Sequence, residues 1–138
     1  MIRVFIADDH ELVRRGLKQL LSETPDMVVA GEASNGSELF EKLRQDNCDI
    51  VLLDISMPGR DGLDILAQLN REKTNLPVLI LSMYPEELYA LRSLRLGASG
   101  YVTKESAPNE LIEAIRTILT GKKYISPSLT KKLAISQK

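Results

Sequence analysis

The chain has 138 residues, 43% of them hydrophobic, and carries 18 basic and 19 acidic side chains. This length suits one ordinary domain with an apolar core, and the balanced charge gives no electrostatic case for nucleic-acid or membrane binding by these residues alone. The single cysteine, Cys48, excludes an internal disulfide, and no apolar run approaches the roughly 20 residues that cross a bilayer. We therefore expect a soluble, cytoplasmic domain.

Short apolar runs alternate along the chain with longer segments in which leucine and isoleucine recur at helical spacing. The runs predict strands at residues 2–7, 27–33, 50–54, 78–82 and 100–102, each followed by a helix. Asn35, Pro108, Gly97 and Gly121 stand where helix starts and ends are expected. The third and fourth runs are apolar without alternation, which is typical of strands covered on both faces of a parallel sheet. The pattern predicts an α/β doubly wound domain.

The end of the sequence differs from the rest in composition. After Gly121 the chain contains Lys122, Lys123 and Pro127, and its apolar residues are only weakly periodic. We expect residues 1–121 to form the domain and residues 122–138 to begin a linker toward an output domain that this chain lacks. The lysines are interpreted as a solvated face of that linker.

Side chains that can bind ligands or take part in a reaction stand at or just past the expected strand ends. They are Asp8 and Asp9, Asp54, Ser82 and Lys104. In a doubly wound sheet ligands bind beyond the carboxyl ends of the strands, so these side chains should converge on one rim. Three carboxylates, one hydroxyl and one ammonium are thereby expected in one pocket.

Crowded carboxylates repel one another and need compensation. Two charges about 4 Å apart cost on the order of 4 kcal/mol at an effective dielectric near 20, so either pKa values rise or a cation binds. An all-oxygen site beside a phosphate favours Mg²⁺. A carboxylate is also a competent nucleophile for phosphoryl transfer, with a metal and a lysine to neutralise charge in the transition state.

Four motifs together resemble the receiver domain of response regulators in two-component signalling. They are the acidic pair at residues 8 and 9, LLDISMPGRDG around Asp54, Ser82 after VLIL, and GASGYVTKE around Lys104. The pieces LSMY, GASGYVTKE and GKKYISP further resemble the NarL/FixJ subfamily, in which a helix-turn-helix DNA-binding domain follows the receiver. The resemblance covers roughly residues 1–121. It implies a flavodoxin-like, CheY-like fold of five parallel strands in the order 2-1-3-4-5.

By matched position, the resemblance makes Asp54 the phosphoryl acceptor from a sensor histidine kinase. It assigns the Mg²⁺ ligands to Asp8, Asp9, Asp54 and the backbone carbonyl of Ser56.

The remaining roles that the resemblance implies belong to the loops around the acceptor. Ser82 and Lys104 would bind the phosphoryl oxygens, and Tyr101 would be the aromatic that reorients upon activation. Pro58 and Gly59 would shape the loop after Asp54.

Each residue also has a simpler structural interpretation. The acidic pair at 8 and 9 could cap the first helix, Asp54 could be a turn residue, and Tyr101 could be ordinary core. His10 is interpreted as a solvated residue at a helix start rather than as a ligand, and Cys48 as inert. The convergence of the whole set favours function for the carboxylates, Ser82 and Lys104.

Four functions compete at this point. The leading one is a phosphorylation-activated switch, not an enzyme, which accepts phosphate and slowly dephosphorylates itself. A Mg²⁺-dependent phosphatase of the haloacid dehalogenase type is disfavoured, because such enzymes carry a second Asp where this chain has Ser56. Direct DNA binding is expected only through an absent C-terminal domain, and a stand-alone receiver acting through protein partners stays open. Phosphorylation-dependent homodimerisation is a further hypothesis; a membrane partner is not expected.

Overall fold

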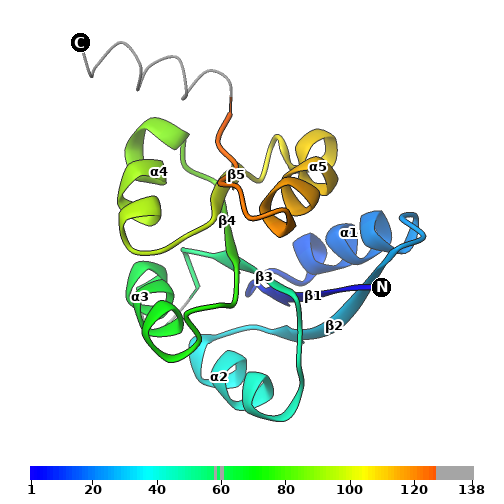
Figure 1. The fold of residues 1–138 in the computed structure, drawn as a ribbon, viewed down its shortest axis with the longest axis horizontal. Coiled ribbons are helices and arrows are strands. Elements are labelled where there is room, and N and C mark those ends of the chain that lie inside the picture. Colours follow the sequence, from blue (N-terminus) through cyan, green and yellow to red (C-terminus); the bar gives the residue numbers. More distant parts are fainter. Residues whose placement is uncertain (58, 60, 127–138) are drawn as a thin grey trace.

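The computed structural model describes residues 1–57, 59 and 61–126. Within them, strands and helices alternate five times along the chain (Figure 1). The strands are β1 (Ile2–Ala7), β2 (Met27–Ala33), β3 (Ile50–Asp54), β4 (Val78–Ser82) and β5 (Gly100–Thr103). The helices are α1 (Glu11–Ser22), α2 (Gly36–Gln45), α3 (Gly62–Glu72), α4 (Glu86–Arg95) and α5 (Ala107–Leu119). The predicted strand segments are all present, and β5 extends one residue further than expected.

All the strand pairings are parallel, and the strand order is β2-β1-β3-β4-β5. The doubly wound fold with the order 2-1-3-4-5 is thus confirmed. After β2 the chain crosses to the other side of β1, so the order in which strands are added to the sheet reverses between the neighbouring strands β1 and β3. Ligand sites in such sheets form at this switch point, beyond the carboxyl ends of the strands.

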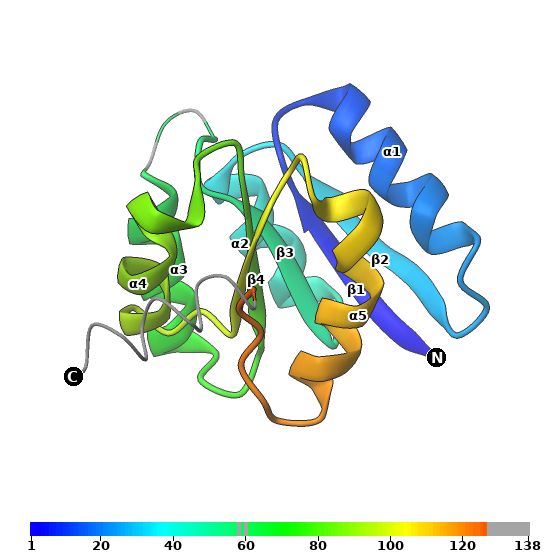
Figure 2. The same ribbon diagram turned by 90° about the horizontal axis from the view of Figure 1, so that it is seen from above.

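Helices cover both faces of the sheet. Helices α1 and α5 lie on one face, and α2, α3 and α4 lie on the other (Figure 2). Two separate apolar cores result, one on each face. The side chains of β3 and β4 are buried along their whole length, which explains why these two runs lack a polar alternation.

Local capping explains where several helices begin and end. The side chain of Asn35 accepts a hydrogen bond from the Glu38 N–H at 2.9 Å, as the sequence predicted for the start of α2. Helices α4 and α5 are followed by Gly97 and Gly121, whose φ angles are +108° and +95°. These left-handed conformations close the helix ends and favour glycine. None of the helices in the described ranges is sufficiently long and apolar to cross a membrane.

The residues directly after α5 pack back onto β5, the edge strand. The Tyr124 N–H donates to the Ser99 carbonyl at 2.9 Å, and the Tyr101 N–H donates to the Tyr124 carbonyl at 3.3 Å. The Tyr124 hydroxyl also donates to Glu110 on α5 at 2.7 Å. The described part of the expected linker therefore contacts the folded unit as far as Ser126. The remainder, residues 127–138, lies outside the described residues, and the linker assignment stays a prediction.

Candidate functional site

The parallel strands bring the predicted residues to one end of the sheet. Asp54 and Ser82 are the last residues of β3 and β4, and Asp8 directly follows β1. The Asp8 N–H donates to the Ala33 carbonyl at 2.9 Å, which extends the β1–β2 pairing by one bond. The Lys104 N–H donates to the Ser82 carbonyl at 2.8 Å, which fixes the residue after β5 in the same way. Backbone hydrogen bonds thus place the functional side chains.

A partly buried lysine lies between two buried carboxylates. Lys104 Nζ is 2.9 Å from Asp8 Oδ2 and 3.2 Å from Asp54 Oδ2. The side chains of Asp8 and Asp54 are 1% and 0% exposed, and that of Lys104 is 13% exposed. Charges buried this deeply occur in proteins when they are paired or when they serve a site.

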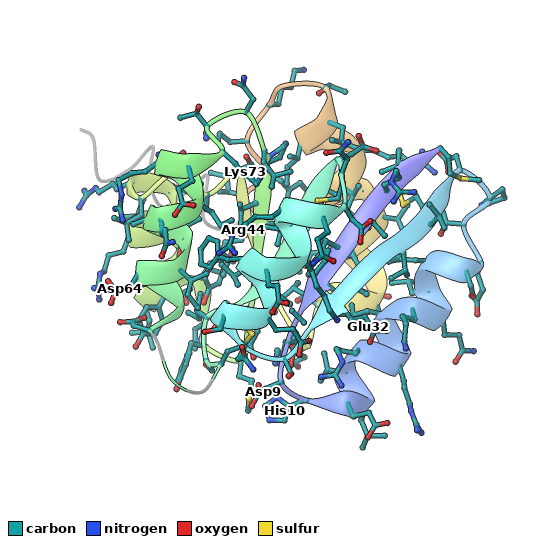
Figure 3. All side chains as sticks on the ribbon, turned by 90° about the horizontal axis from the view of Figure 1, so that it is seen from below. Asp9, His10, Glu32, Arg44, Asp64 and Lys73 are labelled. Atoms are coloured by element: carbon teal, nitrogen blue, oxygen red, sulfur yellow. The ribbon has the colours of Figure 1, made fainter. Side chains whose placement is uncertain are left out.

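Asp9 and His10 form the outer part of the same cluster. His10 Nδ1 is 3.3 Å from Asp8 Oδ1 and 3.2 Å from Asp9 Oδ1. Figure 3 shows Asp9 and His10 next to each other at this end of the sheet. One ligand atom from each of Asp8, Asp9, His10 and Asp54 lies within 4.8 Å of the others. His10 is 54% exposed and directly precedes α1, which agrees with its interpretation as a solvated residue at a helix start.

Burial and neighbouring charges shift the pKa values in this pocket. Burial is the largest influence on Asp54; it raises the pKa of that carboxyl and outweighs the Ser56 N–H and the Lys104 ammonium, which lower it. For Lys104, burial lowers the pKa, but the Asp8 and Asp54 carboxylates more than compensate and the net pKa is raised. The lysine is therefore charged at neutral pH, whereas the Asp54 carboxylate is held at an energetic cost.

Several buried atoms of the cluster have no hydrogen-bond partner among the described residues. They are Asp8 Oδ2, Asp9 Oδ1, Asp54 Oδ2 and Lys104 Nζ. Lys104 lies within ion-pair distance of Asp8 and Asp54, but these ion pairs leave lone pairs of the carboxylates without a hydrogen-bond donor. Unsatisfied carboxylate oxygens that converge from three residues are a donor set suited to a hard divalent cation. The residues present thus fit a metal site.

The loop after Asp54 is held in place by backbone contacts. The Ser56 N–H donates to Asp54 Oδ1 at 2.9 Å, so this oxygen is fixed and Oδ2 is left facing Lys104. Gly62, the first residue of α3, lies so close to Ile55 that an added Cβ would stand 2.5 Å from the Ile55 carbonyl oxygen. No side chain fits there, which explains the glycine. The predicted role of the Ser56 carbonyl in metal binding stays a prediction.

The two loop residues predicted to shape this turn differ in what the structure describes. Gly59 has a φ of +92°, a conformation that favours glycine. Pro58 lies outside the described residues. At the start of α3 the Asp61 side chain accepts from the Leu63 N–H at 2.9 Å, so Asp61 caps this helix.

Ser82 and Tyr101 meet through the loop between β4 and α4. The Ser82 hydroxyl oxygen accepts from the Tyr84 N–H at 2.9 Å, and the Tyr101 hydroxyl donates to the Tyr84 carbonyl at 2.9 Å. Tyr101 is 1% exposed, and burial raises its pKa. The structure therefore shows Tyr101 in an inward position. The Tyr84 carbonyl was not expected from the sequence, because a backbone partner leaves no mark on residue type.

The alternative that the acidic pair only caps α1 is not supported by the geometry. The residue that precedes α1 is His10, and its side chain forms no capping hydrogen bond. Asp8 Oδ1 accepts from the His10 N–H at 2.8 Å, which orders the loop and not the helix.

A comparison with known families assigns this arrangement. The family model of the response regulator receiver domain matches residues 4–116. The chain belongs to this family. The receiver resemblance seen in the sequence is thus confirmed, and with it the interpretation of the chain as a signalling domain of response regulators.

Individual relatives agree with this assignment. The chain is 38% identical over 135 residues to the response regulator GacA of Pseudomonas viridiflava, and 36% identical over 137 residues to the response regulator UvrY of Escherichia coli (strain K12). These alignments cover 98% and 99% of this chain but 63% of each relative, so the chain spans less than two thirds of their length.

Solved structures give the same result. A LuxR-family two-component response regulator from Aurantimonas sp. SI85-9A1 has a TM-score of 0.89 at 34% identity, covering 98% of this chain and 96% of that one. A structure of RcsB dimers bound to DNA has a TM-score of 0.86 at 28% identity, covering 94% of this chain and 66% of that one.

Proposed function

We propose that this receiver domain accepts a phosphoryl group on Asp54 from a sensor histidine kinase, with Mg²⁺ bound at Asp8, Asp9 and Asp54. The observation that carries this proposal is the 0% exposed Asp54 carboxylate, whose Oδ2 lies 3.2 Å from Lys104 beside a second buried carboxylate. A purely structural ion pair would need one carboxylate for one lysine. Here the excess negative charge suits a bound cation, which together with Lys104 would offset the charge of a transferred phosphoryl group.

The geometry distributes the steps of the transfer among the residues. Asp54 Oδ1 is occupied by the Ser56 N–H, and Oδ2 is the oxygen available to attack phosphorus. The new acyl phosphate bond forms at Oδ2 as the bond from phosphorus to the donor's imidazole nitrogen breaks. Lys104 Nζ stands beside Oδ2 and neutralises charge on the phosphoryl oxygens. Asp8, Asp9 and Asp54 would hold Mg²⁺, which would supply a second positive charge to the site.

Phosphorylation would act as a switch through the β4–α4 loop. Ser82 lies at the end of β4 next to Lys104, and its hydroxyl holds the Tyr84 N–H. A phosphoryl oxygen that draws the Ser82 hydroxyl toward Asp54 competes with this bond and moves Tyr84, whose carbonyl holds Tyr101. The switching role of Tyr101 follows as part of the proposal. The domain is then a switch and not a turnover enzyme, which is supported by Ser56 at the position where phosphatases of the haloacid dehalogenase type carry an Asp.

The output of the switch is proposed from the relatives. The matched relatives are response regulators longer than this chain, and RcsB has been solved as dimers bound to DNA. We infer that this receiver acts in the cytoplasm within a protein that also has a C-terminal DNA-binding domain. Such a protein would dimerise on phosphorylation and regulate transcription. A receiver that acts only through protein partners is the alternative. Sedimentation with and without beryllofluoride tests the dimer: an unchanged mass in both conditions would count against it.

The decisive experiment is incubation with acetyl phosphate and Mg²⁺ followed by intact-mass measurement. We expect wild type to gain one phosphoryl group and Asp54→Asn to gain none. Asp64→Asn is the matched control, because Asp64 is an exposed carboxylate on α3 away from the cluster (Figure 3). A mass gain that survives in Asp54→Asn would place the acceptor elsewhere. Multiple turnover on small phosphoesters would instead favour a phosphatase.

A further inference from the structure

Arg14, in the first turn of α1, reaches back to the loop that carries the acidic pair. Its NH1 donates to the Asp8 carbonyl at 2.6 Å, and its Nε donates to Glu32 Oε1 on β2 at 3.1 Å. The guanidinium group is largely buried, with the side chain 19% exposed. A positive side chain near the N-terminus of a helix is disfavoured by the helix dipole, so this placement needs a specific partner.

The hydrogen bond from Arg14 completes the fixation of Asp8. The Asp8 N–H is held by the Ala33 carbonyl at 2.9 Å, and Asp8 Oδ1 accepts from the His10 N–H at 2.8 Å. Arg14 holds the remaining backbone polar group of this residue, the carbonyl of the peptide that leads into Asp9. The orientation of that peptide plane determines where the Asp9 side chain starts. The carboxylates of Asp8 and Asp9 thus depend on one backbone position.

Glu32 in turn keeps Arg14 in place. Glu32 Oε2 accepts from Lys18 at 2.9 Å, and the Glu32 carbonyl accepts from Lys42 at 2.6 Å. Burial raises the pKa of Glu32, but Lys18 and Arg14 outweigh this effect and the net pKa is lowered. Glu32 is therefore ionised and fixed at neutral pH. A planar guanidinium can hold a carboxylate and a carbonyl at once through separate donors, whereas a lysine presents a single point charge.

We propose that Arg14, anchored by Glu32, is a positioning residue for the cation site, which orients the Asp8–Asp9 peptide so that both carboxylates face the metal. The inference rests on the proposed function in that the cluster binds Mg²⁺. Arg14 itself does not touch the metal or the phosphoryl group. Its effect is to order the ligands before the cation arrives, which removes part of the entropy cost of binding.

The test compares Arg14→Ala with Arg15→Ala in the 138-residue protein. Arg15 is the next residue of the same helix, carries the same charge and is 67% exposed, with Glu11 as its ion-pair partner at 3.0 Å. Mg²⁺ is titrated against the unphosphorylated protein and binding is followed by amide NMR shifts. We expect Arg14→Ala to weaken Mg²⁺ binding about 10-fold, as loss of a ligand-orienting partner does. Arg15→Ala should bind within about 2-fold of wild type, since it removes only a surface pair.

Two further variants separate positioning from general stability. Arg14→Lys keeps the charge but cannot hold both partners, so we expect a loss between wild type and Arg14→Ala. Glu32→Gln removes the anchor; combined with Arg14→Ala it should weaken Mg²⁺ binding no more than Arg14→Ala alone, because Glu32 acts through Arg14. If Arg14→Ala does not fold, Arg14→Lys and Glu32→Gln carry the test by themselves.

The outcomes distinguish the inference from the function on which it rests. If wild type does not bind Mg²⁺, the proposed metal site fails. If wild type binds Mg²⁺ and the folded Arg14 and Glu32 variants bind it equally well, the metal site stands and the positioning role is overturned. Equal losses in the Arg14 and Arg15 variants would overturn it too, since they would show a charge effect without geometry.

Discussion

Cations and carboxylates meet at both ends of the sheet, but in opposite surroundings. At the carboxyl end, Lys104 lies 2.9 Å from Asp8 Oδ2, with side chains that are 13% and 1% exposed. At the amino end, Arg116 NH2 lies 2.8 Å from Asp26 Oδ1, and both side chains are 48% exposed. The contact distances are nearly the same. The difference lies in the water that surrounds the pairs.

Exposure to water determines how each ion pair shifts the pKa of its carboxylate. The Arg116 hydrogen bond lowers the pKa of Asp26, the ordinary result of an opposite charge beside an acid. The pKa of Asp54 is raised although a lysine lies beside it, because burial outweighs the attraction. The exposed pair joins α5 to the start of β2, whereas the cluster at the carboxyl end holds more buried carboxylates than its one lysine can neutralise. Changes at the two ends should therefore have different consequences.

The largest expected effect on stability comes from removing the cation that lies between the two buried carboxylates. Lys104→Met leaves the Asp8 and Asp54 carboxylates buried without a countercharge, and we expect a loss of about 2–3 kcal/mol in the free energy of unfolding, because loss of one partner strands the other charge. Urea unfolding at neutral pH without divalent cations measures it. Lys73→Met is the control, an exposed lysine at the opposite end of the sheet (Figure 3). Equal losses in the two variants would remove the distinction between the ends.

The thiol of Cys48 also lies at the amino end of the sheet, and its reactivity gives a second test of how burial shifts a pKa. Burial, followed by the charge of Asp49, raises the pKa of Cys48 from an ordinary 9.0 to about 11. The thiolate fraction at neutral pH is then roughly 100-fold lower than for a free thiol, and alkylation should slow accordingly. We expect iodoacetamide to modify the native protein roughly 100-fold more slowly than the protein unfolded in guanidinium, with the native rate rising until pH reaches about 11. Similar rates in the two states would contradict the raised pKa.

A smaller effect is expected at the edge of the carboxyl-end site. Tyr101→Phe removes the hydroxyl that donates to the Tyr84 carbonyl and should lower the free energy of unfolding by about 1 kcal/mol, the usual net value of one such bond. Tyr84→Phe is the matched control, since Tyr84 contributes its backbone carbonyl and keeps it in the variant. Urea midpoints of both proteins provide the measurement. A larger loss in Tyr84→Phe would show that the Tyr84 hydroxyl, rather than this bond, holds the loop.

Residue type and order predicted the fold and the centre of the site, whereas backbone contacts stayed hidden. The apolar runs of β3 and β4 indicated a parallel sheet, and strand-end geometry then brought Asp8, Asp54 and Lys104 together. The carbonyl of Tyr84 and that of Asp8 are acceptors that every residue carries, so their partners Tyr101 and Arg14 could not be inferred from the sequence. For the same reason, the contact of the segment after Gly121 with β5 was not expected, because it is made by main-chain atoms.

The smallest expected effect tests the exposed end of the comparison. Arg116→Gln removes the cation of the Arg116–Asp26 pair, and we expect no detectable change in the urea midpoint at physiological salt, because water and ions screen exposed pairs. The lowered pKa of Asp26 means that any contribution of the pair is present above the ordinary pKa of an aspartate and is lost as the pH falls through the lowered value. A stability difference between variant and wild type should therefore emerge only at low salt and neutral pH, and vanish in acid. A loss at physiological salt as large as that of Lys104→Met would show that contact distance, not burial, sets the strength of both pairs.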